Sequence, residues 1–234
     1  MKKILFLSFF IFFIFHFLSF CDVGNIFVKY KGLDNVHLSF YGQVYLHRGK
    51  LILKVMETEE ILFQQEFGEN GGYVSKNIHH TSLSEGTYTY KLWSYWIDDE
   101  GNIVSTQLLA SVSVDINGKI YGELLYDETI NDTAFLEGDI TIPENKQLTL
   151  NGNLVGLSEY PNYQRKNVYV KGDIEFGRDV AINELNIHFQ SKSVNIEKLG
   201  GNGSLIFYSN SSGSTVNKCF GSLGITIKNN TSLT

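Results

Sequence analysis

A short strand unit that recurs in the second half of the chain constrains the fold more than any other feature. Residues 136–156 (LEGDITIPENKQLTLNGNLVG) and residues 170–189 (VKGDIEFGRDVAINELNIHF) both open near a Gly-Asp-Ile triplet and continue as short alternating strands. The two triplets start at Gly138 and Gly172. Two further stretches approximate the unit, residues 199–207 and 220–227. Units of this kind stack, so that each coil buries the apolar face of the next.

The stretch GDITIPENKQLTLNG (residues 138–152) resembles the first coil of parallel right-handed β-helix proteins. Pro143 suits a corner between strands because it cannot donate a ladder hydrogen bond. The resemblance implies a short parallel β-helix over residues 135–234, although an antiparallel sandwich would show similar alternation. The residues expected to face the interior are Ile140/Ile142, Leu148/Leu150, Val168/Val170, Ile174/Phe176, Leu185/Ile187/Phe189, Val194/Ile196 and Ile225/Ile227.

The first half of the chain predicts antiparallel β-structure. Val36, Leu38 and Phe40 alternate with more polar residues, which is typical of a half-buried strand. Residues 51–57 and 61–67 form a plausible hairpin. A second hairpin joins residues 87–97 to residues 103–116 across a turn rich in Asp, Gly and Asn.

Residues 83–92, LSEGTYTYKL, resemble the penultimate-strand corner of immunoglobulin-like and fibronectin-type-III-like modules. The matching positions are Leu83, Gly86, Thr87, Tyr88, Tyr90, Gly101 and Asn102. The resemblance implies an immunoglobulin-like β-sandwich over residues 22–117. Residues 118–134 are then expected to be a linker or capping segment before the repeats.

Residues 1–21 resemble a secretory signal peptide, with Lys2 and Lys3 before an unbroken apolar run. Two endings are open. Cleavage after Cys21 would use Ser19 and Cys21 as the small residues at the cleavage site. Alternatively, residues 18–21 (LSFC) resemble a bacterial lipobox, which would make Cys21 a lipid attachment site. Both endings predict an exported bacterial protein, either secreted or held in the cell envelope as a lipoprotein.

Charge and cysteine content limit the partners. The formal net charge is -6, and no basic cluster is present of the kind that binds a nucleic-acid backbone. After export Cys219 would have no intramolecular disulfide partner, and it is expected to be buried beside Phe220. Contact with a membrane is expected only through the signal peptide or a lipid anchor.

No nucleophile elbow, phosphate loop, HExxH or CxxC spacing occurs in the sequence. His79 and His80 are adjacent, so on a strand they face opposite sides and cannot both bind one ion. The carboxylates between Glu123 and Glu144 lack the spacing of a calcium loop. No cofactor and no metal ligand are therefore assigned.

The β-helix resemblance directs attention to two carboxylates, because polysaccharide lyases and hydrolases of this fold line one face of their coils with charged side chains. Asp139 and Asp173 stand at corresponding places in the repeated unit, with Arg165, Lys171 and Arg178 nearby. Such a pair could act on a sugar as acid and base. A Gly-Asp step is also a turn device, in which the Asp side chain bonds backbone N–H groups. The turn interpretation is preferred, and no catalytic residue is assigned.

The strand at residues 87–97 is apolar on both faces toward its end. The residues concerned are Trp93, Tyr95 and Trp96. Exposed Trp and Tyr can stack on sugar rings or contact a protein partner, but packing between domains is the preferred interpretation.

These observations predict a non-enzymatic exported cell-envelope or surface protein with an adhesive or structural role, which binds a surface polysaccharide or a protein. The alternative is a carbohydrate-active β-helix protein, either a polysaccharide lyase or hydrolase, or a sugar-binding module. The last repeat-like strand is followed only by a short polar stretch, so self-association through this end, or continuation in a longer repeat protein, is also expected.

Overall fold

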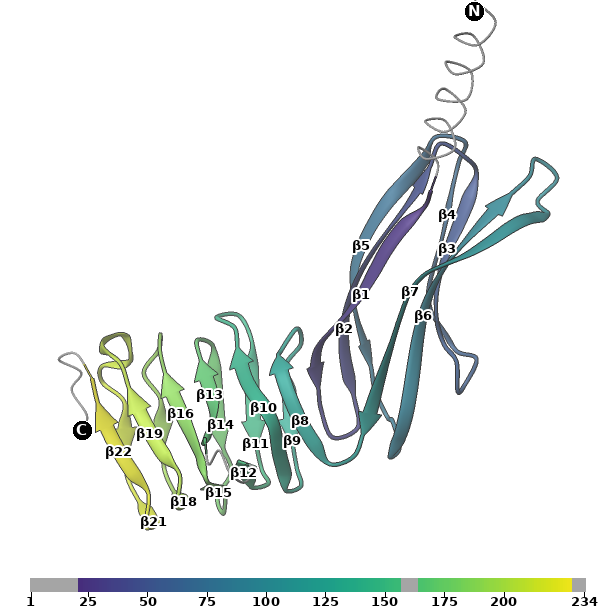
Figure 1. Ribbon diagram of the computed structural model, residues 1–234. Helices are drawn as coiled ribbons and strands as arrows, with labels where there is room; N and C mark the ends of the chain where they lie inside the picture. The colour runs from purple at the N-terminus through teal and green to yellow at the C-terminus, as the bar shows by residue number, and fades with distance from the viewer. Residues whose placement is uncertain (1–20, 157–163, 229–234) are drawn as a thin grey trace, which may run out of the picture. The chain divides into compact units, whose positions relative to one another are not determined.

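The computed structural model describes residues 21–156 and 164–228 (Figure 1). Within these ranges every regular element is a β-strand except one 3-10 turn, η1 (Ser209–Ser211). The same residues form no helix that is long and apolar enough to cross a membrane. The chain divides into two compact units. The sandwich unit comprises residues 21–27, Ser39–Ile78 and Thr87–Val114, and the solenoid unit comprises Val28–Leu38, His79–Gly86, residues 115–156 and residues 164–228.

The first seven strands form antiparallel sheets. Their bounds are β1 (Val23–Lys31), β2 (Val36–Tyr45), β3 (Gly49–Val55), β4 (Ile61–Phe67), β5 (Gly71–His80), β6 (Gly86–Ile97) and β7 (Ile103–Ile116). A four-stranded sheet has the order β4-β3-β6-β7, and β2 pairs with β1 and β5. Both predicted hairpins are confirmed, because β3 pairs antiparallel with β4 and β6 is the neighbour of β7.

The core of the sandwich unit lies between these two groups of strands. Leu51 and Leu53 of β3, Leu92 of β6 and Phe40 of β2 are at most 1% exposed. The Phe40 ring lies 5.0 Å from that of Phe63 on β4. The antiparallel sheets thus support the predicted sandwich in part.

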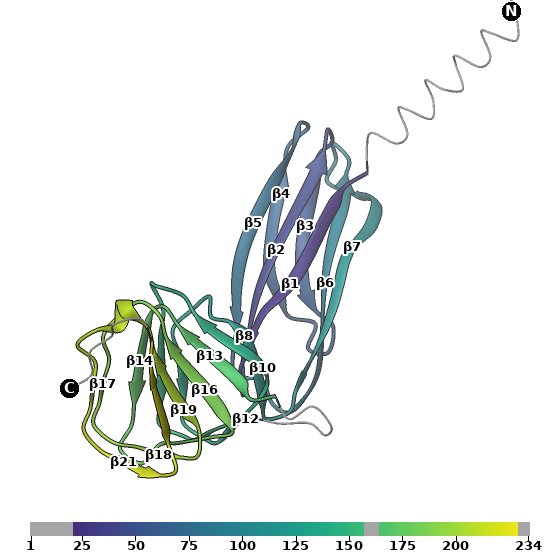
Figure 2. The ribbon, with the colours of Figure 1, turned by 60° about the vertical axis from the view of Figure 1, so that its left-hand side comes forward.

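The solenoid covers residues 119–227 in about five turns, which confirms the predicted β-solenoid character of the repeats. Nearly all its neighbouring strands are parallel, and they form three faces, as the view of Figure 2 shows. The first face contains β12 (Leu154–Gly156), β15 (Ala181–Asn183), β18 (Leu199–Gly201) and β21 (Cys219–Gly221). The second contains β13 (Lys166–Val170), β16 (Leu185–Phe189), β19 (Ser204–Phe207) and β22 (Gly224–Ile227). The third contains β9 (Glu128–Ile130), β11 (Gln147–Leu150), β14 (Asp173–Phe176), β17 (Asn195–Ile196) and β20 (Thr215–Val216).

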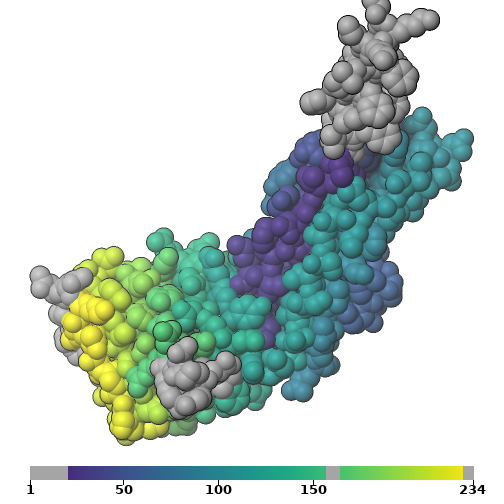
Figure 3. Space-filling view, in the orientation of Figure 1, coloured from purple at the N-terminus to yellow at the C-terminus, as the bar shows by residue number. Residues whose placement is uncertain are grey.

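The strand β10 (Ala134–Ile142) joins the first two faces. Its first residues pair with β12, and its last residues pair with β13. Both parts also pair with β8 (Lys119–Glu123), with a shift of register between Leu136 and Ile140. The single strand β10 therefore contributes to both the first and the second face, whereas in the later coils each of these faces has its own strand. Figure 3 shows the later coils as successive bands from green to yellow.

The structural coil is shorter than the spacing of the two Gly-Asp-Ile triplets. A regular coil runs from Ala134 to its neighbour Leu154, and the last described one runs from Leu199 to its neighbour Cys219. One interval is longer than these, since it runs from Ile140 to its neighbour Val168. The spacing of the triplets is thus not the structural period. The two triplets are separated by more than one coil and by less than two, so they lie at different places in their coils.

The interior of the solenoid is filled as predicted over most of its length. The inward pairs from Ile140/Ile142 to Ile187/Phe189 are buried, except that Phe176 is half-buried against the same core. The Phe189 and Phe207 rings stack with centroids 4.7 Å apart. Ile225 and Ile227 are 44% and 48% exposed, because no described coil lies beyond β22.

Residues from the first strands cover the first coil within the solenoid unit. Tyr30 of β1 is fully buried in the solenoid core, and β1 pairs antiparallel with β8. Gly122 makes this pairing possible: its φ is +108°, and a Cβ there would lie 2.1 Å from the Lys29 carbonyl oxygen. The Lys31 ammonium donates to Glu137 and Asn117 at 2.6 and 3.1 Å. The strands β8 and β9 fall within residues 118–134, the predicted linker or capping segment.

Candidate functional site

The three aromatic residues predicted as ligand contacts lie on β6. Trp93 and Tyr95 are half-buried, whereas Trp96 is 49% exposed. Successive residues of a strand face opposite sides, so Trp93 and Tyr95 share one face and Trp96 lies on the other. The Lys91 ammonium lies 6.0 Å from the Trp93 ring centroid, and the His47 ring lies 5.4 Å from that of Trp96.

A cavity of about 330 Å³ opens beside Trp96 in the sandwich unit. It is lined by Asp22, Leu46, His47, Ser94, Trp96, Ser105 and Gln107. The buried Asp22 carboxylate accepts hydrogen bonds from the Tyr45 N–H at 2.9 Å and from the Ser94 hydroxyl, and it lies 3.0 Å from His47 Nε2. Because Ser94 donates to a carboxylate, it lacks the hydrogen bond to an imidazole that would activate it as a nucleophile. These contacts fix the position of Asp22, the residue that precedes β1.

The two cysteines are exposed. The Gln107 side-chain amide lies 3.2 Å from Cys21 Sγ, and lipid attachment at Cys21 stays a prediction. Residues 1–20, which contain most of the predicted signal peptide, lie outside the described residues. The expectation that Cys219 is buried beside Phe220 is wrong. Both residues belong to β21 on the last described coil, where no described neighbour covers them.

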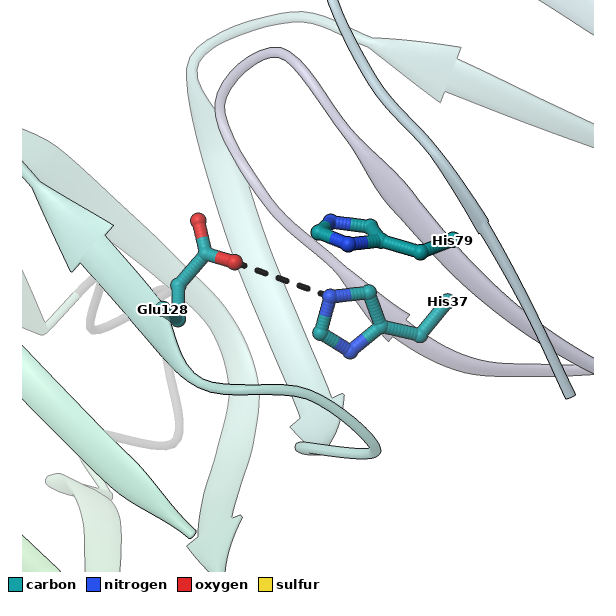
Figure 4. A group of neighbouring side chains, drawn as sticks. All are labelled: His37, His79 and Glu128. Carbon is teal, nitrogen blue, oxygen red and sulfur yellow. Dashed lines mark ion pairs between the residues drawn. The ribbon is translucent and has the colours of Figure 1, made fainter.

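A cluster that the sequence did not predict lies in the solenoid unit, where His37 of β2, His79 of β5 and Glu128 of β9 converge (Figure 4). One nitrogen or oxygen of each residue lies within 4.8 Å of those of the other two. His37 is fully buried, Glu128 is 8% exposed and His79 is exposed. The distance from His37 Nε2 to the nearer Glu128 oxygen is 3.6 Å, and no hydrogen bond to Nε2 is present among the described residues. Two imidazoles and a carboxylate are ligands that zinc uses.

The backbone beside His37 argues against a metal at this nitrogen. The Leu125 N–H donates to His37 Nδ1 at 3.2 Å, so the neutral ring carries its proton on Nε2. A histidine that binds a metal through one nitrogen normally donates from the other. His37 would have to accept on both nitrogens. The geometry favours a neutral His37 whose Nε2–H points toward Glu128.

Further contacts fix the position of this cluster. The Asn35 amide donates to the second Glu128 oxygen at 2.7 Å. The His79 ring stacks on Tyr126 at 4.8 Å, and His37 lies edge-on to both. Burial, with the nearby Glu128 and Asp34 charges, raises the pKa of Tyr30 well above its ordinary value. The residues come from positions 37, 79 and 128, and no local motif connects them.

We expect stability to fall in mild acid because of two histidines. Burial and the neighbouring His37 lower the pKa of His79 below 6.5, against the opposing charges of Glu128 and Asp34. Burial and Lys228 lower the pKa of His188, with Asp139 opposing. A lowered pKa means that the unfolded chain binds the proton more readily than the folded chain. The contribution of each histidine to stability is therefore fully present above about pH 6.5, and it is lost as the pH falls below this value. The thermal midpoint should therefore decrease between about pH 7.5 and about pH 5.5, where carboxylates still stay charged.

The control for this pH effect is the double variant His79→Gln/His188→Gln. Its thermal midpoint should change less over the same pH range, because two of the responsible groups are gone. An identical slope in the variant would assign the acid sensitivity to other residues.

An outward ladder of polar and aromatic side chains runs along the second face of the solenoid. Its polar row is Asp139, Asn167, Asn186 and Ser204. The neighbouring row contains Tyr169 and His188 in register, with Ile206 on the next coil, and Tyr208 just after β19 contacts His188 from beyond the strand. Asn186 donates to Asn167 at 3.1 Å, and His188 lies 3.0 Å from the same oxygen. The Tyr169 and His188 rings stack at 4.9 Å, and His188 Nδ1 lies 3.2 Å from the Tyr208 hydroxyl.

The two carboxylates considered for acid–base chemistry are not equivalent in the structure. Asp139 accepts from the Asn167 N–H at 2.8 Å on the second face, in agreement with a structural role. Asp173 lies on the third face beside Gln147 and pairs with Lys192 at 2.8 Å. The Arg165 guanidinium donates to Ser204 at 2.8 Å. The predicted correspondence of Asp139 and Asp173 is wrong, because the neighbour of Asp139 on the next coil is Asn167, and Asp173 follows the next corner on the third face.

The comparisons with known proteins assign no relative. No protein-family model matches the chain, and neither the curated proteins nor the solved structures yielded a match.

Proposed function

We propose that this chain is a non-enzymatic exported protein of a bacterial cell envelope or surface, with an adhesive role. The proposal includes an immunoglobulin-like identity for the sandwich unit and the binding of a surface polysaccharide by the solenoid unit. The observation that carries it is the outward ladder. Export is supported by the apolar segment of residues 1–21.

The ladder offers the two kinds of contact that a sugar chain uses. Amide, carboxylate and hydroxyl groups donate and accept hydrogen bonds to sugar hydroxyls, and aromatic rings pack on the apolar faces of the sugar. Neighbouring strands are about 4.8 Å apart, so these groups repeat along the axis at short, regular intervals. A polymer with repeated hydroxyl groups can therefore contact several coils at once.

Contacts within the ladder keep its side chains in fixed positions. His188 is fixed on both sides, by Asn167 and by Tyr208, and it stacks on Tyr169. Side chains that are already ordered lose less conformational entropy when a ligand binds. Asp139 is engaged with Asn167, which favours binding over acid–base catalysis.

The test is binding of the purified protein to a glycan array, with the Tyr169→Ala/His188→Ala double variant in parallel. Loss of the stacked rings should weaken the retained glycan by about tenfold or more, the equivalent of about 1.4 kcal/mol. Tyr73→Ala is the matched control, since Tyr73 is 60% exposed on β5 and lies outside the solenoid unit.

Three outcomes would contradict the proposal. The first is a protein that retains no glycan, and the second is a double variant that binds as well as the unchanged protein. The third is cleavage of a polysaccharide that is lost in Asp139→Asn, which would establish the carbohydrate-active alternative.

A further inference from the structure

The strand β7 is a long edge strand without the usual protection of an edge. It has 14 residues and is the last strand of the order β4-β3-β6-β7, so among the described residues it pairs only with β6. Residues 103–114, IVSTQLLASVSV, contain no charged residue and no proline. Natural edge strands are commonly blunted by Lys, Pro or a bulge, because their free N–H and C=O groups pair readily with another chain.

The first half of β7 is open to solvent on both faces. Ile103, Val104 and Leu108 are 62%, 56% and 43% exposed. The other edge strands of the sandwich unit, β4 and β5, each contain charged residues, for example Glu66 and Lys76. The view of Figure 2 shows β7 at the outer margin of its sheet. An exposed uncharged edge of this kind favours strand addition.

We propose that β7 pairs antiparallel with β7 of a second copy of this chain, so that the two four-stranded sheets become one continuous sheet. The contact is isologous: each residue pair occurs twice about the twofold axis. This inference does not depend on sugar binding, which was assigned to the solenoid unit.

A register centred on Thr106 matches the residues of the two copies. Val104 of one copy then faces Leu108 of the other, Ser105 faces Gln107, and Ile103 faces Leu109. Apolar residues thus oppose apolar residues, and polar residues oppose polar ones, without any like-charge pair. Because the residues match at every one of these positions, a second copy of β7 is the partner that this edge fits.

The structure also places the two rows of this strand. Ser105 and Gln107 line the cavity beside Trp96, so they lie on one face of the strand, although both are exposed. Val104, Thr106 and Leu108 therefore lie on the opposite face, since side chains alternate. Pairing would join these exposed residues of both copies into one apolar strip. Strands rich in β-branched residues are well suited to such a contact.

The experiment measures the mass of the full chain in solution by sedimentation equilibrium, in reducing buffer because Cys21 and Cys219 are exposed. We expect a dimer. Val104→Lys should raise the dissociation constant about tenfold or more, because the change occurs at two places in the interface. Ser75→Lys on the other edge strand, β5, is the matched control and should leave the dimer unchanged.

A mixture tests the register. Val104→Lys and Leu108→Glu should each be largely monomeric alone, and mixing them should restore a dimer, because lysine then faces glutamate. Both residues are exposed, so an unchanged thermal midpoint shows that the variants fold. A monomeric unchanged protein, a dimer insensitive to Val104→Lys, or dissociation by Ser75→Lys would overturn the proposal. Failure of the mixture alone would overturn the register.

Discussion

Replacing Phe189 with alanine should destabilise the solenoid unit by about 3–5 kcal/mol, the usual cost of deleting a buried Phe side chain. Phe189 is 1% exposed and stacks on Phe207 of the next coil at 4.7 Å. On the other side it lies beside Val170 of the preceding coil. Its removal leaves a cavity shared by three coils. Denaturant unfolding measures the loss as a lower midpoint with an unchanged slope.

Phe135→Ala provides the comparison in the same unit. Phe135 is 39% exposed on β10, and its removal should change the free energy of unfolding by no more than about 0.5 kcal/mol. Equal losses in both variants would show that the interior of the coils is not the source of stability.

Replacing Tyr90 with alanine should cost the sandwich unit about 3–5 kcal/mol as well. Tyr90 is fully buried on β6, opposite Val55 of β3. Burial, with smaller effects of Tyr88, Glu57 and Glu60, raises its pKa well above the ordinary value, as expected for a phenol removed from water. The measurement is a shift of the thermal midpoint by several degrees.

Tyr73→Ala is the matched control for this variant. It removes a Tyr that is 60% exposed on β5 and should leave the midpoint nearly unchanged. A midpoint unaffected by Tyr90→Ala would contradict the assignment of β6 to the core.

Local alternation was sufficient to predict the strands and the inward rows of the solenoid. Period-2 patterns report which residues share a face, and Val168 and Ile187 are buried as expected. The coil length was not predictable from the repeated Gly-Asp-Ile triplet. Asp139 lies on the second face beside Asn167, whereas Asp173 lies after the next corner on the third face, although its neighbours in the sequence resemble those of Asp139.

The candidate sites depended on pairings between distant strands. His37 and His79 come together because β2 pairs with β5, and Glu128 arrives from the first coil. Each residue alone resembles an ordinary strand residue. The outward ladder is likewise created by register: Asn167 and Asn186 are neighbours only because their strands are one coil apart. By contrast, the apolar residues on both faces of β6 indicated that some aromatic side chains lie outside the core, and the structure shows that Trp96 is the exposed one.

The stacking of the coils has a consequence for how chains of this kind can change in size. The coils differ slightly in length, since Ala134 pairs with Leu154, Lys166 with Leu185 and Asn186 with Ser204, yet their buried rows stay in register. Adding or removing one whole coil therefore keeps every remaining side chain on its face. A shift by a single position within a strand would instead turn its buried row outward. Viable length variants should therefore differ by whole coils, or by residues inserted at a corner, as between Ile140 and Val168. The solenoid can in this way evolve in discrete steps.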